Sequence, residues 1–193
     1  MAVTRAAVQE TTIRVGPFTN LPELLRSLGY DPQPLFKHCG MPLPVFANPD
    51  NRLPFISTSR LFEYCAETTG VDHLGLLLGQ MSTASHLGLA GFILRTAPTA
   101  RDALHALVEY LDLHDQGGIA SLTLGPDHSE LSYGLLLART CAVEQIYDLS
   151  AVMIYKILNS VCGHHWKPDN IYLARRQPAD LSPYQQFFNA QIY

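Results

Sequence analysis

The sequence LGLAGFILRTAPTARDALHAL, residues 87–107, contains two apolar segments on either side of Pro98 and Thr99. From Thr99 to His114, apolar side chains recur at the spacing of one helix face. The Thr99 hydroxyl can accept a hydrogen bond from the amide of Asp102, whose carboxylate lies in the positive first turn. The sequence therefore predicts an amphipathic helix that begins at Thr99. Its apolar stripe consists of Ala100, Ala103, Leu104, Leu107, Val108 and Leu111.

The first apolar segment places Gly88 and Gly91 on one side of another predicted helix. A glycine inside a helix costs about 0.5 to 1 kcal/mol relative to alanine, so two of them indicate that another backbone packs closely against this side. Two interpretations follow. Either the segment is a packing seam without chemistry of its own, or its edges form part of a binding site.

Before this stretch, helices are predicted at residues 21–28, at 34–39, from Ser57 to Gly70 and at 71–80, the last of them capped by Asp72. Residues 41–55 are rich in proline and predict a loop without helix or central strand. Residues 1–16 predict a loose start or a short edge strand at residues 13–15.

After this stretch the period changes to two. Residues 119–124 and 129–137, joined by the turn sequence GPDH, predict an antiparallel hairpin that extends into a small sheet. Residues 141–163 predict a long, buried helix with Glu144, Asp148 and Asn159 on its polar side. A strand at 170–174, a helix from Ser182 and the opening of a strand at 189–193 complete an α+β fold. Because the sequence stops at that apolar opening, we expect it to be cut from a longer chain.

Length and composition favour one globular domain over residues 1–193, because apolar residues make up 47% of the chain and charged residues 16%. The net charge of -4 excludes a basic footprint for nucleic acid within this segment. Four widely spaced cysteines indicate neither a zinc site nor a disulfide framework, which favours reduced thiols in the cytoplasm. No apolar run is long enough for a membrane helix.

The sequence carries no catalytic constellation and no motif for a cofactor. His164 and His165 near Cys162 invite comparison with a metal site, but adjacent histidines rarely bind one ion and no third ligand follows at helical spacing. Likewise, His38 and Cys39 are neighbours that seldom form a nucleophile and its base. We therefore predict no enzyme activity, no metal and no cofactor.

Several aromatic or histidine side chains lie within or beside apolar stripes, where a ring packs while its polar tip faces a cavity. These candidate ligand-binding residues are Phe92, Tyr110, His114, Tyr133, Tyr147 and Tyr172. Arg139 and Arg95 stand at the ends of predicted elements, where they can bind a ligand carboxylate. The alternatives are ordinary core aromatics and solvated surface arginines.

Three segments together resemble the N-terminal effector domain of AraC-type bacterial transcription regulators, the arabinose-binding branch. They are DHLGLLLGQ (72–80), HLGLAGFILRTAPTARDALHALVEYLDLH (86–114) and HHWKPDNIYLARRQPADLSPYQQFF (164–188). The resemblance runs from about Leu21 to Tyr193. It implies a sensor domain, joined by a linker to a C-terminal pair of helix-turn-helix units that are absent from this sequence and that contact promoter DNA.

The leading hypothesis is a cytoplasmic sensor that binds a small effector and acts through a homodimer. The predicted lining has few amides or carboxylates, which favours an apolar acid or an amino-acid-like compound over a sugar. The alternative is a dimerisation or protein-interaction module with a vestigial pocket, which predicts an exposed apolar helix face and no cavity. An enzyme would instead require His114 within hydrogen-bond reach of a carboxylate such as Glu144.

Overall fold

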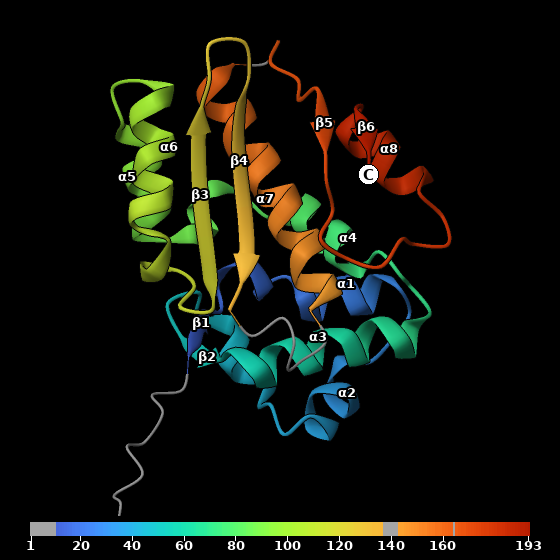
Figure 1. Ribbon diagram of the computed structural model, residues 1–193. Helices are drawn as coiled ribbons and strands as arrows, with labels where there is room; N and C mark the ends of the chain where they lie inside the picture. Colours follow the sequence, from blue (N-terminus) through green and yellow to red (C-terminus); the bar gives the residue numbers. More distant parts are fainter. Residues whose placement is uncertain (1–10, 137–142, 164) are drawn as a thin grey trace, which may run out of the picture.

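The computed structural model describes residues 11–136, 143–163 and 165–193. Within these ranges the fold is α+β, as the sequence predicts (Figure 1). The helices are α1 (Leu21–Ser27), α2 (Pro32–His38), α3 (Phe55–Thr69), α4 (Leu74–Met81), α5 (Leu89–Thr96), α6 (Ala100–Glu109), α7 (Glu144–Cys162) and α8 (Ser182–Phe188). The strands are β1 (Thr12–Arg14), β2 (Arg52–Pro54), β3 (Gly118–Leu124), β4 (Ser129–Leu135), β5 (Asn170–Ile171) and β6 (Gln191–Ile192).

Helix α7 is the centre of the fold. It packs against α3, α4 and α6, and in Figure 1 the β3–β4 hairpin crosses in front of it. Its core side is apolar and is provided by Ile146, Leu149, Val152, Met153 and Ile157. The predicted central helix is thus confirmed. The prediction that Asp148 lies on its polar exterior is wrong, because the Asp148 side chain is fully buried.

Helices α4 and α7 approach closely along two glycines of α4. A Cβ atom on Gly75 would lie 2.1 Å from the carbonyl oxygen of Gln145, and one on Gly79 would lie 2.6 Å from the Cβ of Val152. Because residues i and i+4 share a helix face, these glycines form one flat contact strip. The predicted N-cap of this helix is wrong: His73 occupies the cap position, and Asp72 binds an arginine instead.

The stretch that includes residues 87–107 folds as α5 and α6. Thr99 is the N-cap of α6, and its hydroxyl accepts a hydrogen bond from the Asp102 amide at 3.1 Å, as predicted. Gly91 also has the predicted role, because a Cβ there would lie 1.9 Å from the carbonyl oxygen of Ala84. Gly88 does not: it precedes α5 with a φ of +61°, a conformation that glycine adopts without strain. Helix α6 ends at Glu109, before the predicted His114, and a 3-10 turn (η4, Leu111–Leu113) follows.

The proline-rich segment 41–55 is more regular than predicted. It contains a 3-10 turn, η2 (Leu43–Ala47), and strand β2, which pairs antiparallel with β1. Pro54 is tolerated because it is the last residue of β2, at the end of a two-stranded sheet. The edge strand predicted at 13–15 is observed one residue earlier, as β1. Two further 3-10 turns are η1 (Gly16–Phe18) and η3 (Ala84–Leu87).

The predicted hairpin is confirmed as β3 and β4, with Gly118 opposite Leu135 and Leu124 opposite Ser129. Among the described residues, β3 and β4 form a two-stranded sheet, without the further strand that the predicted small sheet would need. Strands β5 and β6 pair in parallel, and with α8 they cover one side of α7 through a small apolar cluster. The buried members of this cluster are Leu76, Val152, Tyr184, Phe188 and Ile192. Within the described ranges, no helix has the length and hydropathy that crossing a bilayer requires.

Candidate functional site

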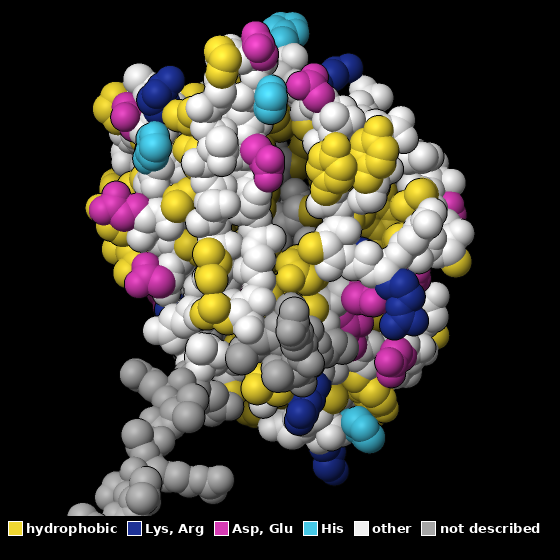
Figure 2. All heavy atoms as spheres, viewed as in Figure 1, with side chains coloured by type: hydrophobic (Ala, Val, Ile, Leu, Met, Phe, Trp, Pro, Cys, Tyr) yellow, Lys and Arg dark blue, Asp and Glu magenta, His cyan; other side chains and the backbone are white. Residues whose placement is uncertain are grey.

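A groove of about 1020 Å³ lies between the β3–β4 hairpin, α7 and residues 166–174. Figure 2 shows it as the hollow beside the hairpin on this face of the molecule. Charged side chains stand in its wall, among them Glu130, Lys167 and Asp169. Its most prominent feature is a set of aromatic side chains, Tyr133, Tyr147, Tyr155, Trp166 and Tyr172.

Periodicity explains why these side chains meet. Residues 129–133 of β4 line the groove, and alternation along the strand places Leu131 and Tyr133 on the same face. On α7, Tyr147, Ala151 and Ile154 recur at helical spacing and line it from the other side. The rings of Tyr133 and Tyr147 then pack edge to face with their centroids 6.3 Å apart.

A second, smaller cavity of about 50 Å³ lies on the inner side of Tyr133. Tyr133 and Ile154 line both hollows and so form a shared wall between them. Most other residues around the inner cavity are apolar, from β1, α6 and α7 among other elements. The polar residues of its wall are His114, Asp115, Tyr133 and Ser150.

Asp115 binds Tyr133 and the Gly117 backbone through its carboxyl group. Its Oδ2 accepts a hydrogen bond from the Tyr133 hydroxyl at 2.6 Å, and its Oδ1 accepts one from the Gly117 amide at 2.8 Å. Burial raises the pKa of the Asp115 carboxyl. Burial and the neighbouring Asp115 also raise the pKa of Tyr133 well above its usual value. Tyr133 is therefore neutral and donates its hydroxyl proton to Asp115.

His114 has no such partner. Its side chain is buried, with the residue 7% exposed, and Nδ1 makes no hydrogen bond to any described residue. Its backbone carbonyl oxygen accepts a hydrogen bond from the Arg14 amide at 3.0 Å. Burial and the charges of Arg14 and Arg52 lower the pKa of His114 to about 3. The ring is therefore neutral at physiological pH.

Replacing His114 by leucine is expected to make the domain less sensitive to acid. The unfolded histidine takes up a proton below a pH of about 6.5, whereas the folded one stays neutral down to about pH 3, so stability falls with pH across this window. Between about pH 7.5 and about pH 5 the wild type should lose about 2 kcal/mol more than His114→Leu. Urea unfolding at both pH values measures the difference. Equal losses in the two proteins would contradict the buried neutral state of His114.

The predicted ligand-binding residues fall into three groups. Tyr133, Tyr147 and Tyr172 line the groove, and His114 joins Tyr133 at the inner cavity. Phe92 and Tyr110 line neither hollow, and Phe92 is 63% exposed on α5. The structure thus brings four of the six aromatic and histidine candidates together. Of the two arginines, Arg95 is exposed in the last turn of α5 and Arg139 lies outside the described residues.

The pairing of His114 with Glu144 that an enzyme would require is not observed in the described part of the chain. There the Glu144 Oε2 lies 3.5 Å from the Arg175 Nη2, and the His114 Nδ1 has no hydrogen-bond partner. That part also contains no group of three or more His, Cys, Asp or Glu side chains that could hold a metal ion. Of the histidines considered as metal ligands, His164 lies outside the described residues and His165 is exposed.

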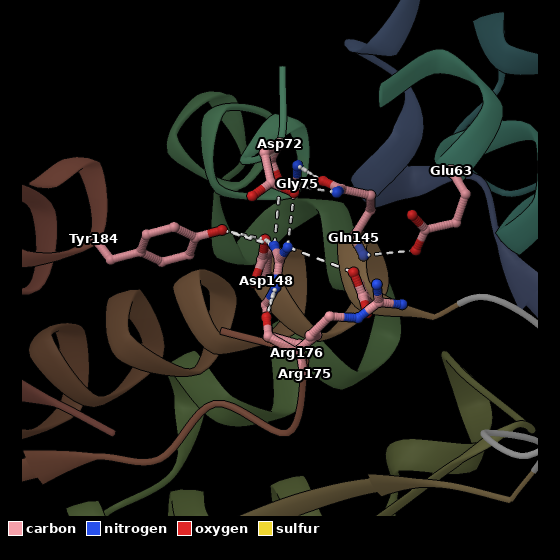
Figure 3. A network of polar contacts seen from close by, with 9 residues as sticks. Glu63, Asp72, Gly75, Gln145, Asp148, Arg175, Arg176 and Tyr184 are labelled. Carbon is pink, nitrogen blue, oxygen red and sulfur yellow. Dashed lines mark hydrogen bonds and ion pairs between the residues drawn. The ribbon is translucent and has the colours of Figure 1, made fainter. Parts of the chain in front are cut away.

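A buried ionic network, which the sequence did not reveal, lies at the first two turns of α7 (Figure 3). The guanidinium of Arg175 is 2% exposed and donates hydrogen bonds to Asp148, to the Tyr184 hydroxyl at 2.8 Å and to Asp72 at 2.9 Å. Tyr184 in turn donates to Asp148 at 2.6 Å. The network connects α8 and the segment around Arg175 to α7 and to the start of α4.

Burial is the main cause that raises the pKa of Asp148 to about 6, against the opposing effect of Arg175 and Tyr184. Next to Asp148, the Gln145 side chain accepts a hydrogen bond from the Gly75 amide at 2.8 Å and donates one to the Asp72 carbonyl at 3.0 Å. Its backbone amide donates to Glu63 of α3 at 2.9 Å. The first two turns of α7 therefore bind α3, α4 and the C-terminal segment at once.

Comparison with known structures gives the same fold. The crystal structure of the transcriptional regulator CdpR from Pseudomonas aeruginosa matches with a TM-score of 0.59 and 16% sequence identity. The match covers 87% of this chain and 50% of that chain, so this chain spans half the length of the regulator it matches. A search of curated proteins found no match.

Comparison with family models shows the family to which the chain belongs. Residues 29–193 match the model of the arabinose-binding domain of AraC transcription regulators, the N-terminal domain. This is an effector-binding family and not a family of enzymes. The matched range contains the groove, most of the inner cavity and the whole buried network. The chain belongs to the arabinose-binding-type N-terminal domains of AraC transcription regulators.

Proposed function

We propose that this chain is the sensing part of a transcription regulator and that its effector binds in the groove between the β3–β4 hairpin and α7. The observation that carries the proposal is the groove itself. Its volume of about 1020 Å³ suits a small molecule, and five aromatic side chains line it. Aromatic rings supply contact area, and their hydroxyl or N–H tips can bind polar groups of the ligand.

The lining favours an effector with an apolar body and a charged end, such as an apolar acid or an amino-acid-like compound, over a sugar. The five rings, together with Leu131, Ile154 and Leu158, provide contact area for the apolar body, and polar side chains of the same lining, such as Glu130 and Lys167, are available to its charged end. Lys167 in the groove wall is a cation that can bind a carboxylate, and Asp169 nearby can bind an ammonium group.

Helix α7 is the element that can transmit binding. One face carries Tyr147 and Ile154 of the groove, and its first turns carry Asp148, which binds the C-terminal segment through Arg175. An effector that binds one arrangement of α7 better than another shifts the population toward that arrangement. We propose that a helix-turn-helix domain beyond this segment responds to the shift and contacts promoter DNA, in the cytoplasm.

A thermal-shift screen of this fragment with amino acids, aromatic acids, fatty acids and sugars tests the sensing function. A ligand at a hundred times its dissociation constant adds about 2.7 kcal/mol, which for a domain of this size raises the melting temperature by roughly 5 to 10 °C. The shift should shrink in Tyr147→Ala and persist in Tyr30→Ala, because Tyr30 lies outside the groove. Equal shifts in both variants would locate the ligand elsewhere.

A second function, homodimerisation, is favoured by one observation. Helix α5 exposes Leu89 and Phe92, which are 58% and 63% exposed, next to each other on its outer side. We propose that residues 1–193 form one effector-binding and dimerisation domain that uses this face. Sedimentation of Phe92→Asp should then show a monomer where the wild type is a dimer. A monomeric wild type would refute the proposed dimer, and the proposal that the effector binds in the groove would still stand.

A further inference from the structure

We propose that the inner cavity behind Tyr133 binds a hydroxyl group of the effector and that His114 is the residue that selects it. The inference rests on the proposed function, because the rest of the effector would occupy the groove. The groove alone does not show which chemical group distinguishes the effector from other apolar acids. The inference names that group as a hydroxyl group.

The first argument is the unused hydrogen-bonding capacity of His114. A buried polar atom without a hydrogen-bond partner destabilises the folded protein, so such an atom calls for an explanation, for example a ligand group that binds it. Nδ1 of His114 is such an atom within the described part of the chain, and the side chain lines the cavity. By contrast, Asp115 in the same wall accepts hydrogen bonds from Tyr133 and from Gly117.

The second argument is size and position. An apolar cavity of about 150 Å³ can hold benzene, so about 50 Å³ accepts roughly two or three non-hydrogen atoms. That is the end of a molecule and not a whole metabolite. The cavity and the groove adjoin at Tyr133 and Ile154, which line both. The end of a compound in the groove therefore reaches the cavity between these two side chains.

The third argument selects the group. The neutral His114 ring offers Nδ1 either as donor or as acceptor, and a hydroxyl group can bind it in either state. An ammonium group would lose its hydration in this mostly apolar cavity, where Arg14 and Arg52 offset the attraction of Asp115. A carboxylate would lie beside the buried carboxyl group of Asp115 and would lose its hydration. A neutral hydroxyl group avoids both costs.

Calorimetric titration with matched pairs of compounds tests the inference. The pairs differ by one hydroxyl group at the end remote from the carboxylate: para-hydroxyphenylacetate and phenylacetate, free L-tyrosine and L-phenylalanine, ω-hydroxyoctanoate and octanoate. In at least one pair the wild type should bind the hydroxylated member about ten-fold more tightly or better. His114→Leu should reduce that ratio to about one while it keeps or improves the affinity for the member without the hydroxyl group. The control His105→Leu makes the same change on the exposed side of α6 and should keep the ratio.

The outcomes separate the two proposals. If the members of every pair bind equally, or if the preference survives in His114→Leu, the hydroxyl site is wrong and the groove remains. If no compound of either kind binds the wild type, the groove fails as a site for apolar acids and the inference fails with it. The melting temperature of each variant shows that it is folded, and removing an unpartnered buried nitrogen should leave His114→Leu at least as stable as the wild type near neutral pH.

Discussion

Replacing Arg175 by methionine is expected to destabilise the domain by about 3 to 5 kcal/mol, because it leaves a buried carboxylate without its cation. Asp148 has no exposed side-chain surface, and its Oδ1 already lacks a partner among the described residues. Tyr184 would remain as a donor to Oδ2, but it carries no charge to balance the carboxylate. Urea unfolding near pH 8, where the carboxylate is ionised, measures the loss.

The neighbouring arginine is the matched control. Arg176 is 87% exposed and its ion pair with Glu144 spans 3.7 Å, so Arg176→Met should change stability by about 0.5 kcal/mol or less. Asp148→Asn in the Arg175→Met background should restore part of the loss, because the buried charge is then gone. If Arg175→Met were no more destabilising than Arg176→Met, the network would not hold the C-terminal segment to α7.

Replacing Gly75 by alanine should cost about 3 kcal/mol by forcing α4 and α7 apart. The new Cβ would lie 2.1 Å from the Gln145 carbonyl oxygen, and a backbone atom inside a helix has little freedom to withdraw. The amide of Gly75 also donates a hydrogen bond to the Gln145 side chain at 2.8 Å, and a shift of α4 would stretch it.

Gly134→Ala provides the comparison for this effect. A Cβ on Gly134 in β4 would meet no atom within 4 Å, so the change should be neutral or stabilising by about 0.5 kcal/mol through the unfolded chain. Urea unfolding of the two variants under one condition separates crowding from the general effect of a methyl group. If Gly75→Ala and Gly134→Ala were equally stable, α4 and α7 would move apart at Gly75 without loss of stability.

Local patterns in the sequence were sufficient for the elements and for part of the site. The alternation around Tyr133 and the helical spacing around Tyr147 predict the hairpin and α7, and these two elements form the groove. The cap at Thr99 was predictable because Asp102, which completes it, is three residues away. Each of these inferences depends on residues that are close in the chain.

Contacts between distant residues were not predictable in the same way. Asp148 and Arg175 are each ordinary polar residues in the sequence, and only the packing of the C-terminal segment on α7 makes them a buried pair. The glycines of α4 were overlooked because the run LGLLLGQ indicates any apolar helix, whereas Gly88 was assigned to a helix that begins only after it. Phe92 satisfied the rule for a pocket aromatic, yet α5 turns it outward.

The emission of Trp166 tests the central claim most directly. It is the only tryptophan in the sequence, and its ring lines the groove. Each compound that raises the melting temperature should therefore change the intensity or wavelength of the emission, with a dissociation constant that agrees with the thermal shift. Compounds that stabilise the domain while the emission of Trp166 stays unchanged would bind elsewhere, and the groove between the hairpin and α7 would not be the effector site.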